Sequence, residues 1–170
     1  MRSKYGEEVF LEVINSHKGI IYKISNSYCK DAEDRKDIIQ EIVIQLWKSF
    51  DQYNNEFKYS TWIYRIALNV AISWYRKQTV RSRMAYPLTS NIFNFSEINQ
   101  NEESEENFNL LQRFINELKE LDRGLMLLYL EEKSYKEIAD IIGITETNVA
   151  TKISRIKIAL RQKFEAIKQS

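Results

Sequence analysis

The residues with the clearest chemical potential lie between Phe57 and Lys77. The aromatic side chains that follow Phe57 are Tyr59, Trp62, Tyr64, Trp74 and Tyr75, and the basic ones are Lys58, Arg65, Arg76 and Lys77. No acid occurs from residue 57 to residue 96, although the chain has 25 basic and 24 acidic residues. Because aromatic faces stack on bases and cations attract phosphates, this pattern suits separated nucleic-acid strands. For this stretch alone, an amphipathic helix with a basic exposed side is the simpler interpretation.

The composition indicates a mostly helical protein of one or two small domains. The chain has 170 residues, 44% of them hydrophobic, with only four Gly and one Pro. Such a composition favours helices around an apolar core. The net charge of +1 predicts no general affinity for nucleic acid, but local basic patches remain possible sites. We therefore expect an all-α protein.

Several classes of protein are not expected from this sequence. No run of about 18 apolar residues is present, so we expect no membrane insertion, and the first residues lack the apolar core of a signal peptide. The single cysteine, Cys29, cannot form an internal disulfide and suits a reducing cytoplasm. With one histidine, His17, and no nucleophile–base pair or phosphate-binding glycine loop, we expect no enzyme, metal, cofactor or small-molecule substrate.

The clearest predicted helix covers residues 31–50. Asp31 can cap it, and Asp34 supplies the acid three residues further on. Its apolar positions recur at helical spacing and predict the buried face: Ile38, Ile39, Ile42, Val43, Leu46, Trp47 and Phe50. The outward face has an apolar residue among acids and an amide: Asp37, Gln40, Glu41 and Ile44. Such a face suits the docking of a basic helix from another protein.

A polar loop over residues 51–60 leads to a second helix, which starts at Ser60 or Thr61 and runs through Lys77. The stripe predicted to face a core is Ile63, Ile66, Ala67, Val70 and Trp74. Off this stripe lie Tyr59, Trp62, Arg65, Asn69, Ser73, Arg76 and Lys77. The sequence does not decide whether Trp62, Tyr64 and Arg65 pack within the protein or contact nucleic acid.

Upstream, the pattern of residues 8–30 predicts one or two helices, with Gly19 as the position of a break.

The pattern predicts two domains, residues 1–80 and 108–170, joined by a flexible acidic linker over residues 81–107. The linker is too long for a loop within a compact domain. It contains an apolar island that can dock on a partner or on a domain: Ile92, Phe93, Phe95 and Ile98. Beyond it, residues 108–130 predict an amphipathic helical segment with a break near residues 122–124.

Residues 134–164 predict a helix-turn-helix. Ser134 and Glu137 form a capping box, Gly143 permits a left-handed turn, and Thr145 caps the second helix. The inward positions are Ile138, Ala139, Ile141, Ile142, Val149, Ile153, Ile156 and Leu160. The outward positions of the second helix are polar or basic: Thr147, Asn148, Thr151, Lys152, Arg155 and Lys157. A helical hairpin shares some of these signals, but their common register favours a duplex-binding motif.

Three stretches resemble the extracytoplasmic-function (ECF) sigma factors, compact members of the bacterial sigma-70 family. Residues 37–47 look like the family's second conserved region, residues 57–69 look like its promoter-melting region, and residues 134–155 look like its terminal helix-turn-helix. The middle stretch is the most specific of the three. The resemblance implies a transcription initiation factor that binds core RNA polymerase, helps to melt the minus-ten element and reads the minus-thirty-five element.

The resemblance also implies a role for each matching position. The residues expected on the clamp helices of the polymerase β′ subunit are Asp37, Gln40, Glu41 and Ile44. Those expected on the minus-ten element are Tyr53, Asn54, Lys58, Tyr59, Trp62, Asn69, Ser73, Arg76 and Lys77, with the loop between Tyr53 and Tyr59 capturing a flipped base. Those expected on the minus-thirty-five element are Thr147, Asn148, Thr151, Lys152 and Arg155. The β flap of the polymerase and an anti-sigma factor are further expected partners.

Three departures and two alternatives qualify this interpretation. Arg35–Lys36 replaces the usual Ala–Glu just before the Asp37 motif, so Asp37, not Asp34, is the matching acid. Ala150 stands where many relatives have a basic residue, and Thr147–Asn148 replace a Gly–Thr pair, so the bases recognised stay open. The first alternative is a conventional dimeric helix-turn-helix regulator that binds duplex DNA without polymerase. It gives residues 31–77 no role. The second alternative is a helical adaptor that binds other proteins through the acidic face.

Overall fold

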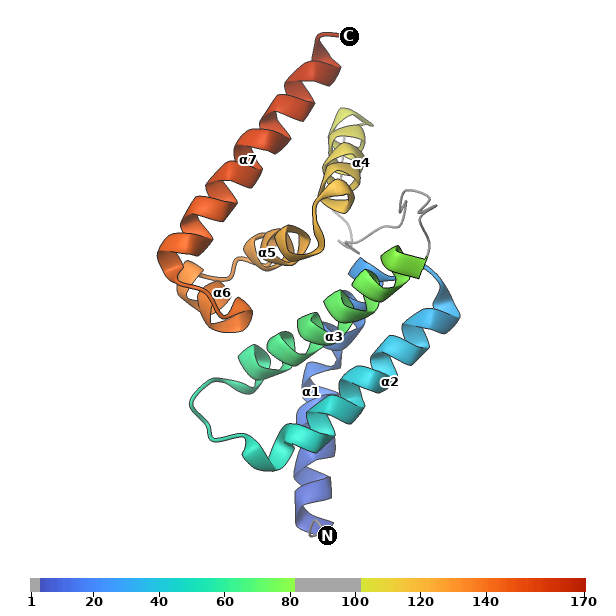
Figure 1. Ribbon diagram of the computed structural model, residues 1–170, viewed down its shortest axis with the longest axis vertical. Helices are drawn as coiled ribbons and strands as arrows, with labels where there is room; N and C mark the ends of the chain where they lie inside the picture. The colour runs from blue at the N-terminus through green and yellow to red at the C-terminus, as the bar shows by residue number, and fades with distance from the viewer. Residues whose placement is uncertain (1–3, 82–101) are drawn as a thin grey trace. The chain divides into compact units, whose positions relative to one another are not determined.

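The structure is a computed structural model that describes residues 4–81 and 102–170. The described residues form seven α-helices and one short 3-10 helix, with no strand among them (Figure 1). The chain divides into two compact units after Arg83. The all-α prediction is confirmed. None of the helices in the described ranges is long and apolar enough to cross a bilayer.

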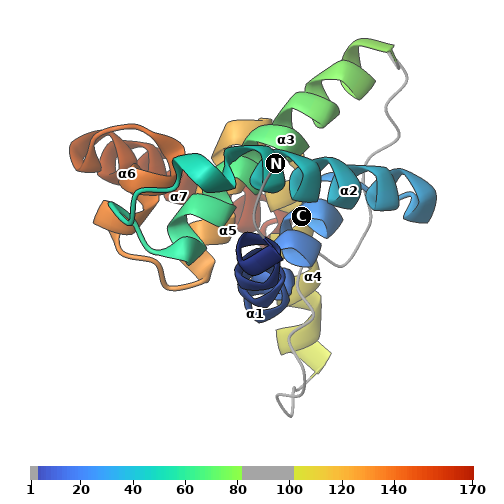
Figure 2. The same ribbon diagram turned by 90° about the horizontal axis from the view of Figure 1, so that it is seen from below.

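The first unit consists of α1 (Lys4–Tyr28), α2 (Ala32–Ser49), the 3-10 helix η1 (Phe50–Gln52) and α3 (Tyr59–Arg81). Helix α1 packs against both α2 and α3, which also pack against each other (Figure 2). Gly19 is exposed and lies inside α1, so the predicted break does not occur. Asp31 caps α2 as predicted, because its carboxylate accepts hydrogen bonds from the backbone N–H groups of Glu33 and Asp34 at 2.9 and 3.0 Å.

The buried face of α3 differs from the predicted stripe. Ile63 and Ala67 are fully buried, as expected, but Ile66, Val70 and Trp74 are only half-buried. The positions buried in their place lie on the side of the helix toward Tyr64: Tyr64, Leu68, Ala71 and Ile72. Helix α3 is covered by two neighbours, α1 and α2, so its core face is wider than one stripe and shifted from it. Tyr64 is therefore a core residue.

The second unit consists of α4 (Glu102–Glu117), α5 (Glu120–Leu130), α6 (Tyr135–Ile142) and α7 (Glu146–Lys168). Helices α4, α5 and α6 all pack against α7. Phe114 of α4 meets Phe164 of α7 edge to face, with ring centroids 5.0 Å apart. The long α7 is thus the element on which the unit is assembled.

One predicted helix break in this part of the chain is wrong, and the helix that follows the linker starts earlier than expected. The helix break lies at Leu118–Lys119, not near residues 122–124, and Arg123 is fully buried inside α5. A guanidinium N–H of Arg123 donates to the carbonyl oxygen of Asn116 at 2.7 Å, which satisfies a carbonyl at the end of α4. Residues 102–107, assigned above to the linker, form the first turns of α4. Acidic side chains at a helix N-terminus are favourable, so the acidity that suggested a linker marks a helix start.

The apolar island Ile92, Phe93, Phe95 and Ile98 lies outside the described residues.

The helix-turn-helix is confirmed in detail. Ser134 and Glu137 make both hydrogen bonds of a capping box at the start of α6. Gly143 ends α6 with φ +83°, and the Thr145 hydroxyl accepts from the backbone N–H of Asn148 at 3.1 Å. The buried inward positions are Ile138, Ala139, Ile141, Val149, Ile153, Ile156 and Leu160, whereas Ile142 is half-buried. The local signals in the sequence therefore located this motif correctly.

Candidate nucleic-acid interface

A cluster of aromatic rings shapes the loop before α3. Tyr53 and Tyr59 stack with ring centroids 4.4 Å apart and an interplanar angle of 21°. Trp62 closes the cluster, with its ring centroid 5.4 Å from that of Tyr53 and 6.3 Å from that of Tyr59. Each of these three rings covers part of the face or edge of the other two. The predicted stacking residues thus form a preassembled platform.

Hydrogen bonds hold the same loop in one conformation. The Tyr53 hydroxyl donates to the carbonyl oxygen of Phe57, and burial raises the pKa of Tyr53, so this hydroxyl stays protonated. The Asn54 side chain accepts from the backbone N–H of Glu56 at 3.1 Å, and Asn55 adopts the left-handed conformation with φ +60°. Lys58 remains exposed. The loop is therefore an ordered feature of the first unit.

Arg65, left undecided above, packs within the protein. Its guanidinium lies 5.3 Å from the centroid of the Phe57 ring, in a cation–π contact. Trp62 is half-buried against its aromatic neighbours, which include Phe50 at 6.1 Å. Both side chains therefore support the loop from α3.

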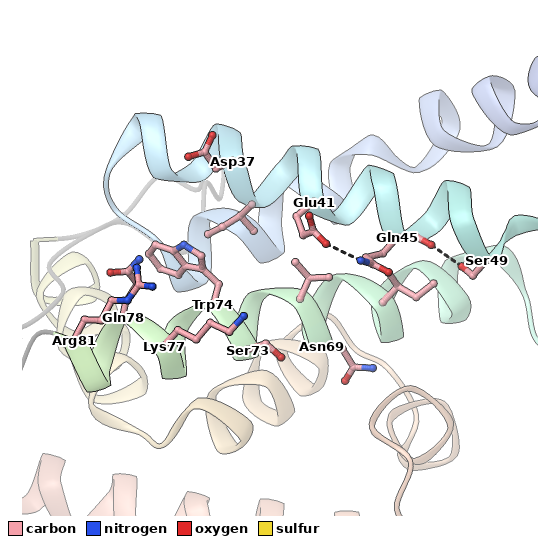
Figure 3. Close-up of a pocket in the computed structure, with 13 residues that line it drawn as sticks. Asp37, Glu41, Gln45, Ser49, Asn69, Ser73, Trp74, Lys77, Gln78 and Arg81 are labelled. Carbon is pink, nitrogen blue, oxygen red and sulfur yellow. Dashed lines mark hydrogen bonds between the residues drawn. The ribbon is translucent and has the colours of Figure 1, made fainter.

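A groove of about 750 Å³ lies between α2 and α3 (Figure 3). From α2 it is lined by Asp37, Ile38, Glu41, Gln45 and Ser49, and from α3 by Ile66, Asn69, Val70, Ser73, Trp74, Lys77, Gln78 and Arg81. Glu41 and Lys77 point into the groove from opposite helices (Figure 3). The Gln45 amide donates to the Glu41 carboxylate at 2.6 Å, which fixes that carboxylate. One wall is thus acidic, the other basic, and half-buried apolar side chains lie between them.

The groove joins two sets of residues that the sequence kept apart. Asp37 and Glu41 belong to the predicted docking face, and Asn69, Ser73 and Lys77 belong to the predicted strand-binding set. Gln40 and Arg76 are exposed but do not line the groove. Ile44 also lies outside it, with 44% of its surface exposed. The predicted docking face therefore reaches from the outer side of α2 over the rim of the groove.

The outer face of α7 presents the predicted polar row. Thr147, Asn148, Thr151 and Arg155 are exposed, whereas Lys152 is half-buried on the flank. The Thr151 hydroxyl donates to the carbonyl oxygen of Thr147 at 3.0 Å, which orients its methyl and oxygen.

The same face of α7 contains one exposed apolar residue that was not predicted from the sequence. Ile158 is 53% exposed and lies seven residues after Thr151. That spacing places it on the same face two turns further along α7. Its position in the sequence could have identified it, because Ile158 is apolar but does not belong to the inward stripe Val149, Ile153, Ile156 and Leu160.

Comparison with known proteins gives both units an assignment. A family model described as Sigma-70 region 2 matches residues 13–81, and one described as Sigma-70, region 4 matches residues 108–160. Together they span more than two thirds of the chain. The chain belongs to the sigma-70 family, as an ECF sigma factor. The groove and aromatic platform thus lie in region 2, and the helix-turn-helix lies in region 4.

Individual relatives agree with this assignment. The ECF RNA polymerase sigma factor SigW of Bacillus subtilis (strain 168) is 28% identical over 171 residues, which cover 95% of this chain and 91% of SigW. The ECF RNA polymerase sigma-E factor of Escherichia coli (strain K12) is 29% identical over 144 residues, covering 79% of this chain and 75% of that one. The match to SigW therefore extends over nearly the whole of both chains.

Two solved structures share the fold. CnrH, in complex with the cytosolic domain of CnrY, is 17% identical with a TM-score of 0.65, and the match covers 94% of this chain and 90% of CnrH. The sigma factor RpoE from Bartonella quintana, in complex with the anti-sigma factor NepR, is 15% identical with a TM-score of 0.66, covering 96% of this chain and 98% of RpoE. They confirm the all-helical fold expected for the family.

This ECF sigma factor is a transcription initiation factor that directs RNA polymerase to promoters. The conventional dimeric regulator, which acts without polymerase, is not favoured, because residues 13–81 match a sigma region that such a regulator lacks. Among the residues that the structure describes, no group of three or more His, Cys, Asp or Glu could hold a metal ion.

Proposed function

We propose that the first unit couples polymerase docking to capture of the opened non-template strand, while the second unit reads the upstream duplex. The observation that carries this proposal is the shared groove, which Asp37 and Glu41 of α2 line together with Asn69, Ser73 and Lys77 of α3. A partner docked on α2 therefore reaches the edge of the strand-binding wall. Polymerase docking and strand capture meet at one place on the protein.

The docking surface consists of Asp37, Gln40, Glu41 and Ile44. All four side chains are exposed, and an apolar residue among carboxylates suits a basic helix with an apolar side chain. The β′ clamp helices of core polymerase are the proposed partner. The second unit, held by its linker, has the β flap as its proposed contact. Fixed spacing between the two contacts raises the effective concentration of each unit at its promoter element.

The minus-ten surface combines the aromatic platform with the α3 wall. A base that leaves the duplex loses a few kcal/mol of stacking and pairing, and one stacked contact with an aromatic ring contributes about 1–3 kcal/mol. We place the flipped base on the outer face of the Tyr53–Tyr59 stack, next to Trp62. Asn54 and Lys58 are exposed at the edge of this platform.

Further along α3, polar and basic side chains continue the proposed strand path. Asn69 and Ser73 supply hydrogen bonds to base edges, and Arg76 and Lys77 supply charge for phosphates. All four side chains are exposed. Because they share one side of α3 with Trp62, one strand can run from the platform along the helix.

The minus-thirty-five surface is the outer face of α7. Its readers are Thr147, Asn148, Thr151, Lys152 and Arg155, near the N-terminal end of the helix. In helix-turn-helix proteins this end enters the major groove. Arg155 is the side chain best suited to a bidentate contact with guanine.

The same proposal includes how the chain is regulated and in which compartment it acts. One similar structure holds an anti-sigma factor, and we propose that a cognate anti-sigma factor sequesters this chain as well. Initiation needs no catalytic group or cofactor from this chain, because the polymerase supplies the chemistry. The site of action is the cytoplasm, where bacterial polymerase works.

The docking claim is tested by the double variant Asp37→Ala/Glu41→Ala. Loss of two interfacial charges is expected to weaken binding to core polymerase by about 2–4 kcal/mol, with unchanged helicity by circular dichroism. The matched control is Glu8→Ala/Glu12→Ala, which removes the same charge from exposed positions of α1. Affinity that is unchanged in the first variant, or reduced equally in both, rejects the docking surface.

A further inference from the structure

Lys157 of α7 is held by an aromatic pair at the end of α5 and the start of α6. Its ammonium donates to the Tyr129 hydroxyl at 2.9 Å and lies 4.8 Å from the centroid of the Tyr129 ring. Tyr135, which opens α6 and is 38% exposed, has its ring 6.5 Å from that of Tyr129. Lys157 itself is exposed. An exposed lysine is thus fixed in one place by two contacts.

Its partner distinguishes Lys157 from other cations that the structure describes. Lys163, on the same helix, pairs with the carboxylate of Glu117, and Lys36 pairs with Glu33 at 2.8 Å. Lys157 instead meets a neutral hydroxyl, which raises its pKa through the hydrogen bond from the ammonium to Tyr129. Lys163 thus has a carboxylate partner within the protein, whereas the hydroxyl that Lys157 contacts leaves the lysine charge available to an anion.

The Tyr129 hydroxyl can act on the same anion. A phenolic oxygen accepts one hydrogen bond and donates another. Tyr129 accepts from Lys157, so its own O–H is left to donate outward. Tyrosine hydroxyls and lysine ammonium groups are common donors to DNA phosphates.

The position of this pair fits the wall of a DNA groove. Lys157 lies roughly 80–120° round α7 from Thr147 and Thr151, on the flank next to α5 and α6. A helix with its side chains is about 10–12 Å across, and the major groove is about 12 Å wide. A helix whose outer row faces the bases therefore turns its flanks toward the phosphates.

We propose that Tyr129, Tyr135, Lys157 and Arg161 form a phosphate-binding patch that holds the upstream duplex irrespective of its sequence. Arg161 is exposed one turn after Lys157 on α7 and adds a second cation. The patch rests on the proposed reading of duplex DNA by α7, and it assigns a separate task to the flank of that helix. Base contacts select the element, and the patch sets the depth and orientation of α7 in the groove.

The test uses the full chain bound to core polymerase and two promoter fragments, one with a minus-thirty-five element selected by the holoenzyme and one with that element scrambled. Affinity is measured by competition over a series of salt concentrations. Lys157→Gln is expected to weaken both fragments by the same factor, roughly 3–10-fold, and to reduce the slope of log affinity against log salt by about 1. Tyr129→Phe is expected to weaken both fragments less, since the cation remains.

Controls separate the patch from general charge and from misfolding. Lys168→Gln removes a lysine from the last turn of α7, beyond the motif, and is expected to change neither affinity nor slope. Lys157→Arg keeps the cation and is expected to retain the wild-type salt slope. Amide exchange of α6 and α7 checks that each variant is folded.

Three results would overturn the proposal. The first is an unchanged salt slope in folded Lys157→Gln, and the second is a loss confined to the selected fragment, which would make Lys157 a base reader. The third is weaker core polymerase binding with DNA affinity intact, which would assign the patch to a protein contact. A wild-type protein that does not discriminate between the fragments would reject base reading by α7, while the salt slope would still test the patch.

Discussion

The region 2 groove and the region 4 outer helix solve different recognition problems. The groove is concave, is lined by two helices, and has carboxylates on one wall and cations on the other. The α7 face is convex and belongs to one helix, whose outer row is polar from Thr147 to Arg155. The first site exists only where α2 and α3 pack together, whereas the second needs only that α7 is held outward.

Because of this difference, substitutions disrupt the two functions in different ways. A change that shifts α2 against α3 affects docking and strand capture together, because both depend on the same walls. A change on α7 affects one contact at a time, because its side chains act independently on successive base pairs. The two sites are therefore expected to respond differently to substitution.

Trp62→Ala is expected to have the largest effect, and only in the first unit. The Trp62 ring contacts Phe50, Tyr53 and Tyr59, so its loss should lower the free energy of unfolding by about 2–3 kcal/mol. All three tryptophans, Trp47, Trp62 and Trp74, lie in this unit, and the fluorescence of the two that remain reports its urea unfolding. Trp74→Ala is the control, because Trp74 lines the open groove, and about 1 kcal/mol is expected. Equal losses would contradict the central role of the platform.

Arg155→Ala is expected to weaken holoenzyme binding at the preferred minus-thirty-five element by about 1–3 kcal/mol. The effect should disappear on a promoter in which the base opposite Arg155 is changed. Asn69→Ala serves as the comparison in the other unit, since its effect should not depend on the upstream sequence. Affinities measured by competition on matched and altered promoters check both. A loss from Arg155→Ala that is equal on all sequences would make Arg155 a phosphate contact.

Substitution of glycine by alanine is expected to change the free energy of unfolding in opposite directions at two positions. Gly143 ends α6 with φ +83°, so Gly143→Ala should destabilise the second unit by about 1–2 kcal/mol. Gly19 lies within α1 and an added Cβ would meet no other atom, so Gly19→Ala should stabilise the first unit by about 0.5–1 kcal/mol. Tryptophan fluorescence follows the first unit, and amide exchange of α6 and α7 follows the second. Stabilisation by Gly143→Ala would contradict the left-handed turn.

Cys29 gives an effect that is visible only at high pH. Burial raises the pKa of its thiol from 9.0 to about 11, so the folded protein favours the protonated form. The contribution of the buried, protonated thiol to the free energy of unfolding is fully present below pH 9. It is lost as the pH rises through about 11. Alkylation by iodoacetamide should therefore keep rising up to about pH 11 in the folded protein, but level off near pH 9 in urea. Identical profiles in both conditions would contradict the burial.

The helix-turn-helix was predicted better than the rest of the chain because its signals are local. Ser134, Glu137 and Gly143 act within one turn of their own positions, so the helix-turn-helix could be placed without knowing what packs on it. The break between α4 and α5 was misplaced, because buried Arg123 looks like a surface residue in sequence. Acidic residues at the start of α4 were equally ambiguous, since linkers and helix N-termini share that composition.

The groove could not be predicted from the sequence. Periodicity correctly placed Asp37 and Glu41 on an outward face and Asn69 and Lys77 off the core. It could not show that these residues line one groove, because that depends on how α2 and α3 pack. Ile66, Val70 and Trp74 were assigned to the core for the same reason: a stripe shows which side is apolar, not how much of it a neighbour covers.

The most direct test of the central claim is transcription by core polymerase from a library of promoter fragments, with and without this chain. We expect transcripts that require the chain and start downstream of two shared elements at a constant spacing. We also expect that Asp37→Ala/Glu41→Ala abolishes most of these transcripts, whereas Glu8→Ala/Glu12→Ala leaves them. Transcription that does not depend on the chain, or sequence-specific binding of duplex DNA by a dimer of the chain without polymerase, would contradict it.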